Sequence, residues 1–229
     1  MLLRKISAYL KEIRGVRLFL PILNKIFDLG KTVFCWFLFY PYLIRHHISS
    51  KRNYERLHVG CGKNYFKNWL NADIEPRADL IIFLQKRLPF KDNYLTRIYS
   101  EHVLEHLTYA TAVYFLKEVR RTLQPGGVLR IAMPDLDDLI DGYQQNWRRF
   151  DWVNWPAFSF IQTKAEMINI AFRWWGHKHL YNKEELARAL SAAGFSRFYF
   201  PLPGQSDYPD LQGLETRKDS KLIAEAIKE

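Results

Sequence analysis

The chain has 229 residues, a hydrophobic content of 48% and a formal net charge of +10. This length is enough for one domain with its own core, and the apolar content excludes an intrinsically disordered chain. The two cysteines, Cys35 and Cys61, are too few for a disulfide framework and indicate a reducing compartment.

The positive charge is concentrated near the N-terminus. Residues 1–54 hold ten Lys or Arg residues and two acidic residues, a net charge of +8. Residues 55–229 hold 24 basic and 22 acidic residues, a net charge of +2. This larger part has no broad basic stripe, so we expect no nucleic-acid partner.

Apolar residues recur at steps of three and four over residues 2–29, with basic residues between them, which predicts amphipathic helices. A second apolar run, at residues 32–44, is rich in aromatic residues and contains Pro41. It is shorter than the about 20 residues that a transmembrane helix needs. We expect residues 1–54 to form a basic amphipathic segment that attaches to an anionic membrane surface without crossing it. The alternatives are helices that cover the domain or form a dimer seam, and a true membrane span.

A short apolar run at residues 57–59 ends in Gly60-Cys61-Gly62. This is the pattern of a buried strand that leads into a loop whose backbone approaches a ligand closely. Asp73, followed by Ile74, ends a second predicted strand. Adjacent parallel strands bring such glycines and such a carboxylate to one edge of the sheet, where nucleoside ligands bind in open α/β sheets. There the carboxylate can accept both ribose hydroxyls.

The periodicity of the remaining chain predicts alternating strands and helices. Residues 63–70 leave room for one or two helical turns only. Asn182 is a predicted helix N-cap, and residues 219–228 fit either a helix or a strand. The other predicted strands are at residues 78–83, 97–100, 128–133 and 195–201, and a further helix is predicted at residues 109–123.

The motifs LPF at residues 88–90, EHVLEHL at 101–107 and LxPGG at 123–127 follow in this order. With them the chain resembles the class I S-adenosylmethionine-dependent methyltransferases, in particular their type 11-like group, which is often met in glycan and cell-surface biosynthesis. The resemblance covers residues 55–228. It implies a doubly wound, Rossmann-like α/β fold with a seven-stranded, mostly parallel sheet and a shortened first helix, preceded by the N-terminal amphipathic helices. It makes residues 55–229 the methyltransferase domain, with residues 219–228 as a last, antiparallel strand.

The resemblance also implies S-adenosylmethionine as the cofactor. Relatives often have an Asp that accepts from the adenine amine where this chain has Phe83, which can stack on adenine but cannot accept its N–H. The expected cofactor contacts are the backbone of Gly60, Cys61 and Gly62 for the methionine part, Asp73 with Ile74 for the ribose, and Glu101 for the amino group.

Methyl transfer is an in-line displacement that needs alignment of donor and acceptor and, for a hydroxyl acceptor, removal of a proton. It requires no metal. The candidates for the base or for substrate contact are His102, Asp135 and His177, with Tyr181 as a further one. His106 is interpreted as a buried structural partner. The aromatic-rich residues 141–180, with interspersed Arg, are the expected substrate cover.

The predicted function is O-methylation of a saccharide or lipid-linked glycan by an enzyme held peripherally on the cytoplasmic face of a membrane. One alternative is a catalytically inactive methyltransferase-like module tethered to the membrane. Another is a zinc hydrolase, because His102-x-x-Glu105-His106 matches the H-x-x-E-H pattern of inverzincin peptidases. The sequence leaves the oligomeric state open.

Overall fold

The computed structural model describes residues 54–75 and 77–229. The predicted amphipathic helices of the N-terminal segment lie outside these described residues. Within the described part of the chain, no helix is both long enough and apolar enough to cross a membrane.

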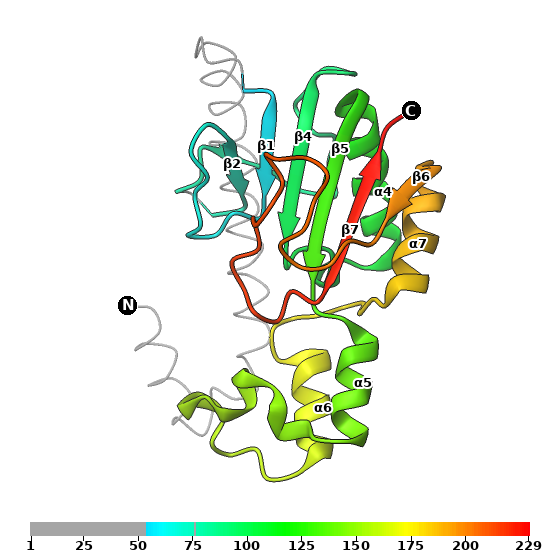
Figure 1. Cartoon of the computed structure of the whole chain (residues 1–229). Helices are drawn as coiled ribbons and strands as arrows, with labels where there is room; N and C mark the ends of the chain where they lie inside the picture. The colour runs from blue at the N-terminus through cyan, green and yellow to red at the C-terminus, as the bar shows by residue number, and fades with distance from the viewer. Residues whose placement is uncertain (1–53, 76) are drawn as a thin grey trace. The chain divides into compact units, whose positions relative to one another are not determined.

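Seven strands of the described chain form one sheet in the order β3-β2-β1-β4-β5-β7-β6 (Figure 1). The strands are β1 Arg56–Val59, β2 Leu70–Asp73, β3 Leu80–Ile81, β4 Leu95–Glu101, β5 Leu123–Met133, β6 Arg197–Tyr199 and β7 Leu222–Ile227. The first five pair in parallel, and β7 runs antiparallel to both of its neighbours. This confirms the predicted Rossmann-like sheet with a last antiparallel strand, and the helical alternative for residues 219–228 is wrong.

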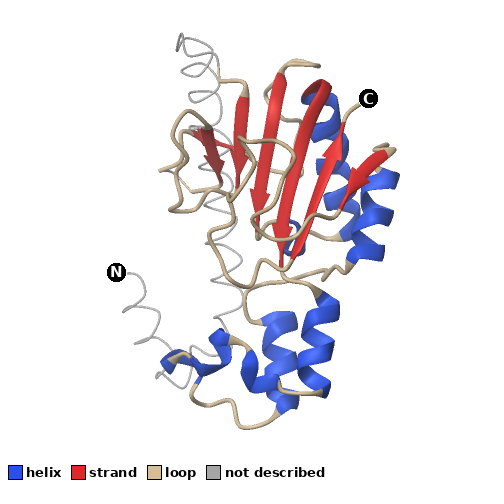
Figure 2. Ribbon diagram, in the orientation of Figure 1, coloured by secondary structure: helices blue, strands red, loops and turns tan. Residues whose placement is uncertain are grey.

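The helices lie between the strands in the sequence (Figure 2). They are α4 Tyr109–Thr122, α5 Leu136–Gln144, α6 Lys164–Arg173 and α7 Lys183–Ala192. Short 3-10 turns are η2 Leu104–His106, η3 Trp147–Arg149, η4 Asp151–Asn154 and η5 Pro156–Phe158. The side chain of Asn182 accepts a hydrogen bond from the Glu185 N–H at 3.0 Å, which confirms the predicted cap of α7.

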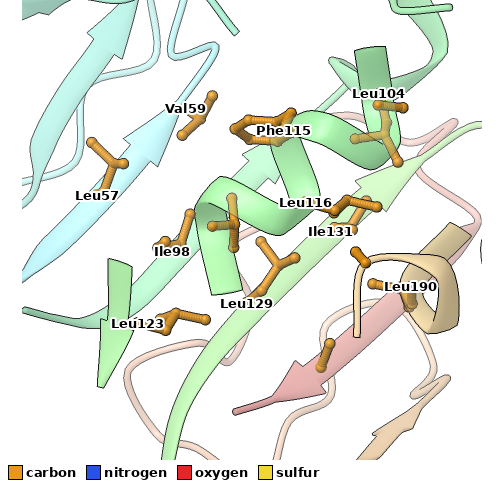
Figure 3. Close-up of a cluster of buried hydrophobic side chains, with 14 of the residues drawn as sticks. Leu57, Val59, Ile98, Leu104, Phe115, Leu116, Leu123, Leu129, Ile131 and Leu190 are labelled. Atoms are coloured by element: carbon orange, nitrogen blue, oxygen red, sulfur yellow. The ribbon is translucent and has the colours of Figure 1, made fainter. Parts of the chain in front are cut away.

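One face of the sheet is covered by α4 and α7. Leu57, Ile98 and Leu129 point from the strands toward Phe115 and Leu116 of α4, and all five are fully buried (Figure 3). Leu190 of α7 joins the same cluster. Burial of each such side chain stabilises the fold by roughly 1.5–3 kcal/mol before ordering costs.

The other face is covered by loops instead of helices. Residues 61–69 contain turns only, as the short spacing predicts. Trp69 from this stretch and Leu211 from the loop before β7 pack on Tyr99 and Val128 of the strands. Figure 1 shows the orange-red segment before β7 crossing in front of β4 and β5.

Several strand boundaries differ from the sequence predictions. The predicted strand 78–83 shrinks to β3, because Asp79 turns its carboxylate to the backbone and side chain of Asn71. The predicted strand 97–100 extends to Leu95–Glu101, and 128–133 begins already at Leu123, since Leu95 pairs with Leu123 across a register shift. At the sheet edge, the predicted strand 195–201 is reduced to β6 Arg197–Tyr199.

A buried ion pair joins the two central antiparallel strands. Arg130 of β5 lies opposite Glu225 of β7, and both side chains are fully buried. The guanidinium of Arg130 donates to Glu225 at 2.5 Å, to Glu215 at 2.7 Å and to the carbonyl of Gln205 at 2.9 Å. Tyr199 of β6 donates its hydroxyl to Glu225. One charged cluster thus fixes β5, β6, β7 and the loop between the last two.

We expect Arg130→Met to lower the free energy of unfolding by about 3–5 kcal/mol, because it leaves the buried Glu225 without its partner. Urea unfolding measures the change. The control is Arg188→Met, which removes an exposed Arg paired with Glu185 and should cost less than about 1 kcal/mol. Equal losses in the two variants would contradict a special role of the buried pair.

Candidate active site

A cavity of about 320 Å³ lies at the carboxyl ends of β1, β2 and β4. This is the edge where open α/β sheets bind ligands, and the volume lies within the range of about 300–1,000 Å³ typical of small-molecule sites. We call it the edge cavity. It is lined by Val59 and Gly60, by Asp73 and Ile74, by residues 82–85, and by His102, Val103, His106 and Leu107.

The loop after β1 presents backbone to the edge cavity. Gly60 has a φ of +71°, and a Cβ at this position would lie 2.1 Å from Cγ2 of Val103. The N–H groups of Gly60 and Cys61 both donate to the carbonyl of Ala72, which ties this loop to β2. Cys61 is buried, and burial raises the pKa of its thiol to about 11. The thiol therefore stays protonated, and Cys61, like Gly62, is not one of the residues that line the edge cavity.

Asp73 ends β2 at the edge cavity, as predicted. One carboxylate oxygen accepts from the Gly62 N–H at 2.8 Å, and the other accepts from the Glu75 N–H at 3.0 Å. Each oxygen keeps a further lone pair, so the fixed carboxylate can accept two more hydrogen bonds. Ile74 is 61% exposed and lines the cavity next to it, and Phe83 provides a second apolar surface.

Glu101 ends β4 but is not one of the residues that line the edge cavity. Its buried carboxylate accepts hydrogen bonds from the backbone N–H groups of Thr216 and Arg217 and from the hydroxyls of Thr216 and Ser220. In this arrangement it fixes the loop before β7. Thr216 and Ser220 are not predictable as partners of Glu101 from local sequence patterns, because Glu101 lies more than 110 positions earlier in the chain.

His102 lies at the end of β4, on the edge cavity. Its φ is +52°, a strained conformation for a residue with a Cβ, and its N–H donates to the carbonyl of Ala132 at 2.9 Å. Burial, followed by the charge of Arg217, lowers the pKa of the imidazole to about 3. At neutral pH the ring is therefore uncharged, a weak base but a good hydrogen-bond acceptor.

The other two predicted catalytic residues lie outside the cavity lining. Asp135 is the N-cap of α5, and its carboxylate accepts a hydrogen bond from the Asp137 N–H at 3.0 Å. This side chain therefore serves as a helix cap. His177 follows α6 and packs its ring 5.0 Å from the ring of His106. Tyr181 is completely buried, and burial raises the pKa of its hydroxyl. Of the predicted catalytic side chains, the structure brings His102 to the edge cavity.

The H-x-x-E-H pattern is not on an α-helix. A peptidase site needs its two histidines one helical turn apart on one face. Here His102 precedes the helical turn in the left-handed conformation, and only Leu104–His106 form a 3-10 turn. Nδ1 of His102 lies 3.3 Å from Oε1 of Glu105 instead of pairing with His106. The zinc hydrolase alternative therefore lacks the geometry on which it depends.

The predicted substrate cover is a small helical layer with its own core. Trp152, Phe158, Met167 and Ile170 form this cluster between η4, η5 and α6. Figure 1 shows α5 and α6 beyond the carboxyl end of β5. The edge cavity is lined by residues at the carboxyl ends of β1, β2 and β4. Several large aromatic side chains of this layer remain exposed: Trp155, Phe160, Phe172 and Trp174.

The residues of the edge cavity fit the S-adenosylmethionine that the resemblance implies. Gly60 brings backbone without a side chain to the cavity lining, with Val103 packed where a Cβ would lie. The carboxylate of Asp73 can accept two hydroxyls, and Ile74 and Phe83 offer apolar surface to a purine ring.

Comparison with known proteins supports the same conclusion. A family model described as a methyltransferase domain matches residues 67–131, which include β2 to β4 and most of β5, and therefore Asp73, Glu101 and His102. An uncharacterised protein of Methanocaldococcus jannaschii is 30% identical over 112 residues, which cover 43% of this chain and 48% of that protein. The chain thus spans about half the length of this curated relative.

Solved structures of similar fold include two S-adenosylmethionine-dependent methyltransferases. The one from Thermotoga maritima is 13% identical with a TM-score of 0.48, covering 93% of this chain and 100% of the other. The one from Archaeoglobus fulgidus is 14% identical with a TM-score of 0.46, covering 88% and 94%. The fold assignment rests on the strand order of the chain itself. By the family match, residues 67–131 are similar to a methyltransferase domain, and this similarity implies S-adenosylmethionine as the cofactor.

Proposed function

We propose that the whole chain is an S-adenosylmethionine-dependent methyltransferase that O-methylates a saccharide or lipid-linked glycan at the cytoplasmic surface of a membrane. The observation that carries the proposal is the edge cavity, where a backbone loop and a fixed carboxylate lie at the carboxyl ends of β1 and β2. The family match over residues 67–131 supports the same reaction class.

The side chains of the edge cavity have separate tasks in this reaction. S-adenosylmethionine, when bound, supplies an electrophilic methyl group. Asp73 and the loop at Gly60 hold the ligand in one orientation, which is the main requirement of an in-line displacement. The uncharged His102 accepts a hydrogen bond from an acceptor hydroxyl and so orients its oxygen lone pair.

The substrate class is inferred from the helical layer of α5 and α6. Trp155 is 52% exposed and Trp174 is 59% exposed, and such aromatic faces suit stacking on a sugar ring. Arg148 lies over the ring of Trp147 at 4.2 Å, which brings a cation to the same layer. Guanidinium groups pair well with carboxylate or phosphate, so an acidic or phosphate-linked saccharide fits this surface.

The location is inferred from residues 1–54, with their net charge of +8 and apolar, aromatic-rich stretches. Each Lys or Arg held near an anionic leaflet contributes about 1 kcal/mol. Burial of several large apolar side chains adds roughly 1.5–3 kcal/mol each before ordering costs. Together these contributions support peripheral or monotopic attachment.

We expect Asp73→Asn to weaken S-adenosylmethionine binding by about 1–3 kcal/mol, because it removes charge-assisted hydrogen bonds to the ribose. Isothermal calorimetry measures the affinity. The matched control is Asp92→Asn, which changes an exposed carboxylate paired with Arg121 and should leave the affinity unchanged. The proposal is contradicted if the wild-type chain binds neither the cofactor nor its demethylated product. That result would support the alternative of a catalytically inactive binding module, which the apolar Phe83 favours.

Labelled-methyl transfer tests the substrate class. Full-length protein, incubated with methyl-labelled cofactor and a fractionated extract of the source cell, should place label in the lipid-extractable or polysaccharide fraction. The same incubation without the protein serves as the blank for non-enzymatic labelling. Label that enters only protein or RNA would overturn the saccharide assignment while keeping the methyltransferase activity.

Vesicle sedimentation tests the location. Full-length protein should sediment with phosphatidylserine-containing vesicles, and less with neutral ones. Replacing Arg4, Lys5, Lys11 and Arg14 by Gln should weaken the association by about 1 kcal/mol per residue. The control makes the same charge change at four exposed lysines of the domain, Lys63, Lys67, Lys91 and Lys117. Equal effects of both sets would contradict an N-terminal attachment site.

A further inference from the structure

Beside the edge cavity, Glu105, His106 and His177 form a cluster that the proposed methyl transfer does not use. Their ligand-type atoms all lie within 4.8 Å of one another. His106 itself lines the cavity, whereas His177 comes from the segment after α6. We propose that these three side chains bind a divalent metal ion of the zinc type.

The backbone fixes the two parts of this cluster against each other. The N–H groups of Lys178 and His179 both donate to the carbonyl of Glu105, at 2.7 and 3.2 Å. Gly176, with a φ of +81°, turns the chain just before His177. The chain after α6 is therefore bound directly to the η2 turn, which brings His177 next to His106.

The surroundings of His177 determine which of its two ring nitrogens carries the hydrogen. Nδ1 lies 2.7 Å from the carbonyl oxygen of Ala171, and since a carbonyl only accepts, Nδ1 must carry the hydrogen. In the uncharged ring this leaves the lone pair on Nε2. Metal-bound histidines almost always donate their other N–H to a carboxylate or a backbone carbonyl in this way, which fixes the ring and its tautomer.

Glu105 supplies a second, independent observation that points to a cation ligand. Its side chain is only 1% exposed, and among the described residues neither carboxylate oxygen has a hydrogen-bond partner on another residue. The nearest group, Nδ1 of His102, lies 3.3 Å from Oε1 without the geometry of a hydrogen bond. Burying a carboxylate without a partner costs free energy. Buried charges are usually either paired with an opposite charge or coordinated to a metal.

The donor set suits zinc and leaves one position open. Two imidazoles and one carboxylate are the ligands of many catalytic zinc sites, in which a water or substrate oxygen takes the fourth position. Metal–ligand bonds of about 2.1 Å place the ligand atoms of a tetrahedral site roughly 3.4 Å from one another. The three ligand-type atoms of the cluster lie within 4.8 Å of one another, so small side-chain rotations would bring them to this spacing. Because His106 lines the edge cavity, the ion lies next to it. Resting on the proposed function, its role there is to bind the acceptor hydroxyl at the open position and to lower the pKa of that hydroxyl.

The test is zinc binding by tag-free, full-length protein, first stripped with a chelator and then titrated with zinc against a chromophoric competitor at about pH 7.5. We expect one equivalent to bind and the thermal midpoint to rise with zinc, because an ion that binds only the folded state stabilises it. His106→Gln, His177→Gln and Glu105→Gln should each weaken zinc binding by about tenfold or more.

His179→Gln is the matched control, since this neighbouring histidine pairs with Glu185 and lies outside the cluster. It should bind zinc like the wild type. Absence of stoichiometric binding to folded wild-type protein, shown by its intact unfolding transition, would overturn the proposal. Equal binding by the wild type and the three cluster variants would also overturn it, because the ion would then sit on other groups such as His46 and His47. Calorimetry with S-adenosylmethionine on the same samples separates this failure from a failure of the proposed function.

Discussion

The guanidinium of Arg130 is fully buried and pairs with the carboxylates of Glu225 and Glu215. Without these partners, a buried charge would destabilise the fold by several kcal/mol. This requirement determines how the second face of the sheet is covered. Glu215 and the carbonyl of Gln205 belong to the loop between β6 and β7, so the loop is held down by the ion pair. In place of helices, a charged network anchors an irregular segment over β4 and β5, and Leu211 can then pack on the strands.

The same loop is also tied to the carboxyl end of β4 through Glu101. Because its carboxylate receives four hydrogen bonds from Thr216, Arg217 and Ser220, the loop is fixed at the end of β4 as well as at β5. This brings the charge of Arg217 close enough to His102 to lower the pKa of that imidazole further. The properties of the candidate catalytic histidine thus depend on a loop that precedes the last strand, and through it on the buried pair of Arg130.

The sequence predicted those features that local patterns encode. Gly60 and Asp73 were found because a strand, a glycine loop and a strand-end carboxylate follow each other within a few residues, and the register of parallel strands then places them together. The partners of Glu101 were not found, since more than 110 residues separate them and only the folded loop joins them. Asp135 shows a third case: a polar residue at a strand end is also a good helix cap, and sequence alone does not separate the two uses.

The proposed ligand site of the edge cavity is accompanied by poor proton-transfer groups. An efficient general base has a pKa near the working pH, whereas burial and Arg217 hold the pKa of His102 at about 3. Asp135 is engaged as a helix cap, and Glu101 is engaged by the loop. For an acceptor hydroxyl, the described residues therefore align the oxygen better than they remove its proton. An ion at Glu105, His106 and His177 would change this balance, because a metal acidifies the hydroxyl that it binds and so reduces the need for a strong base.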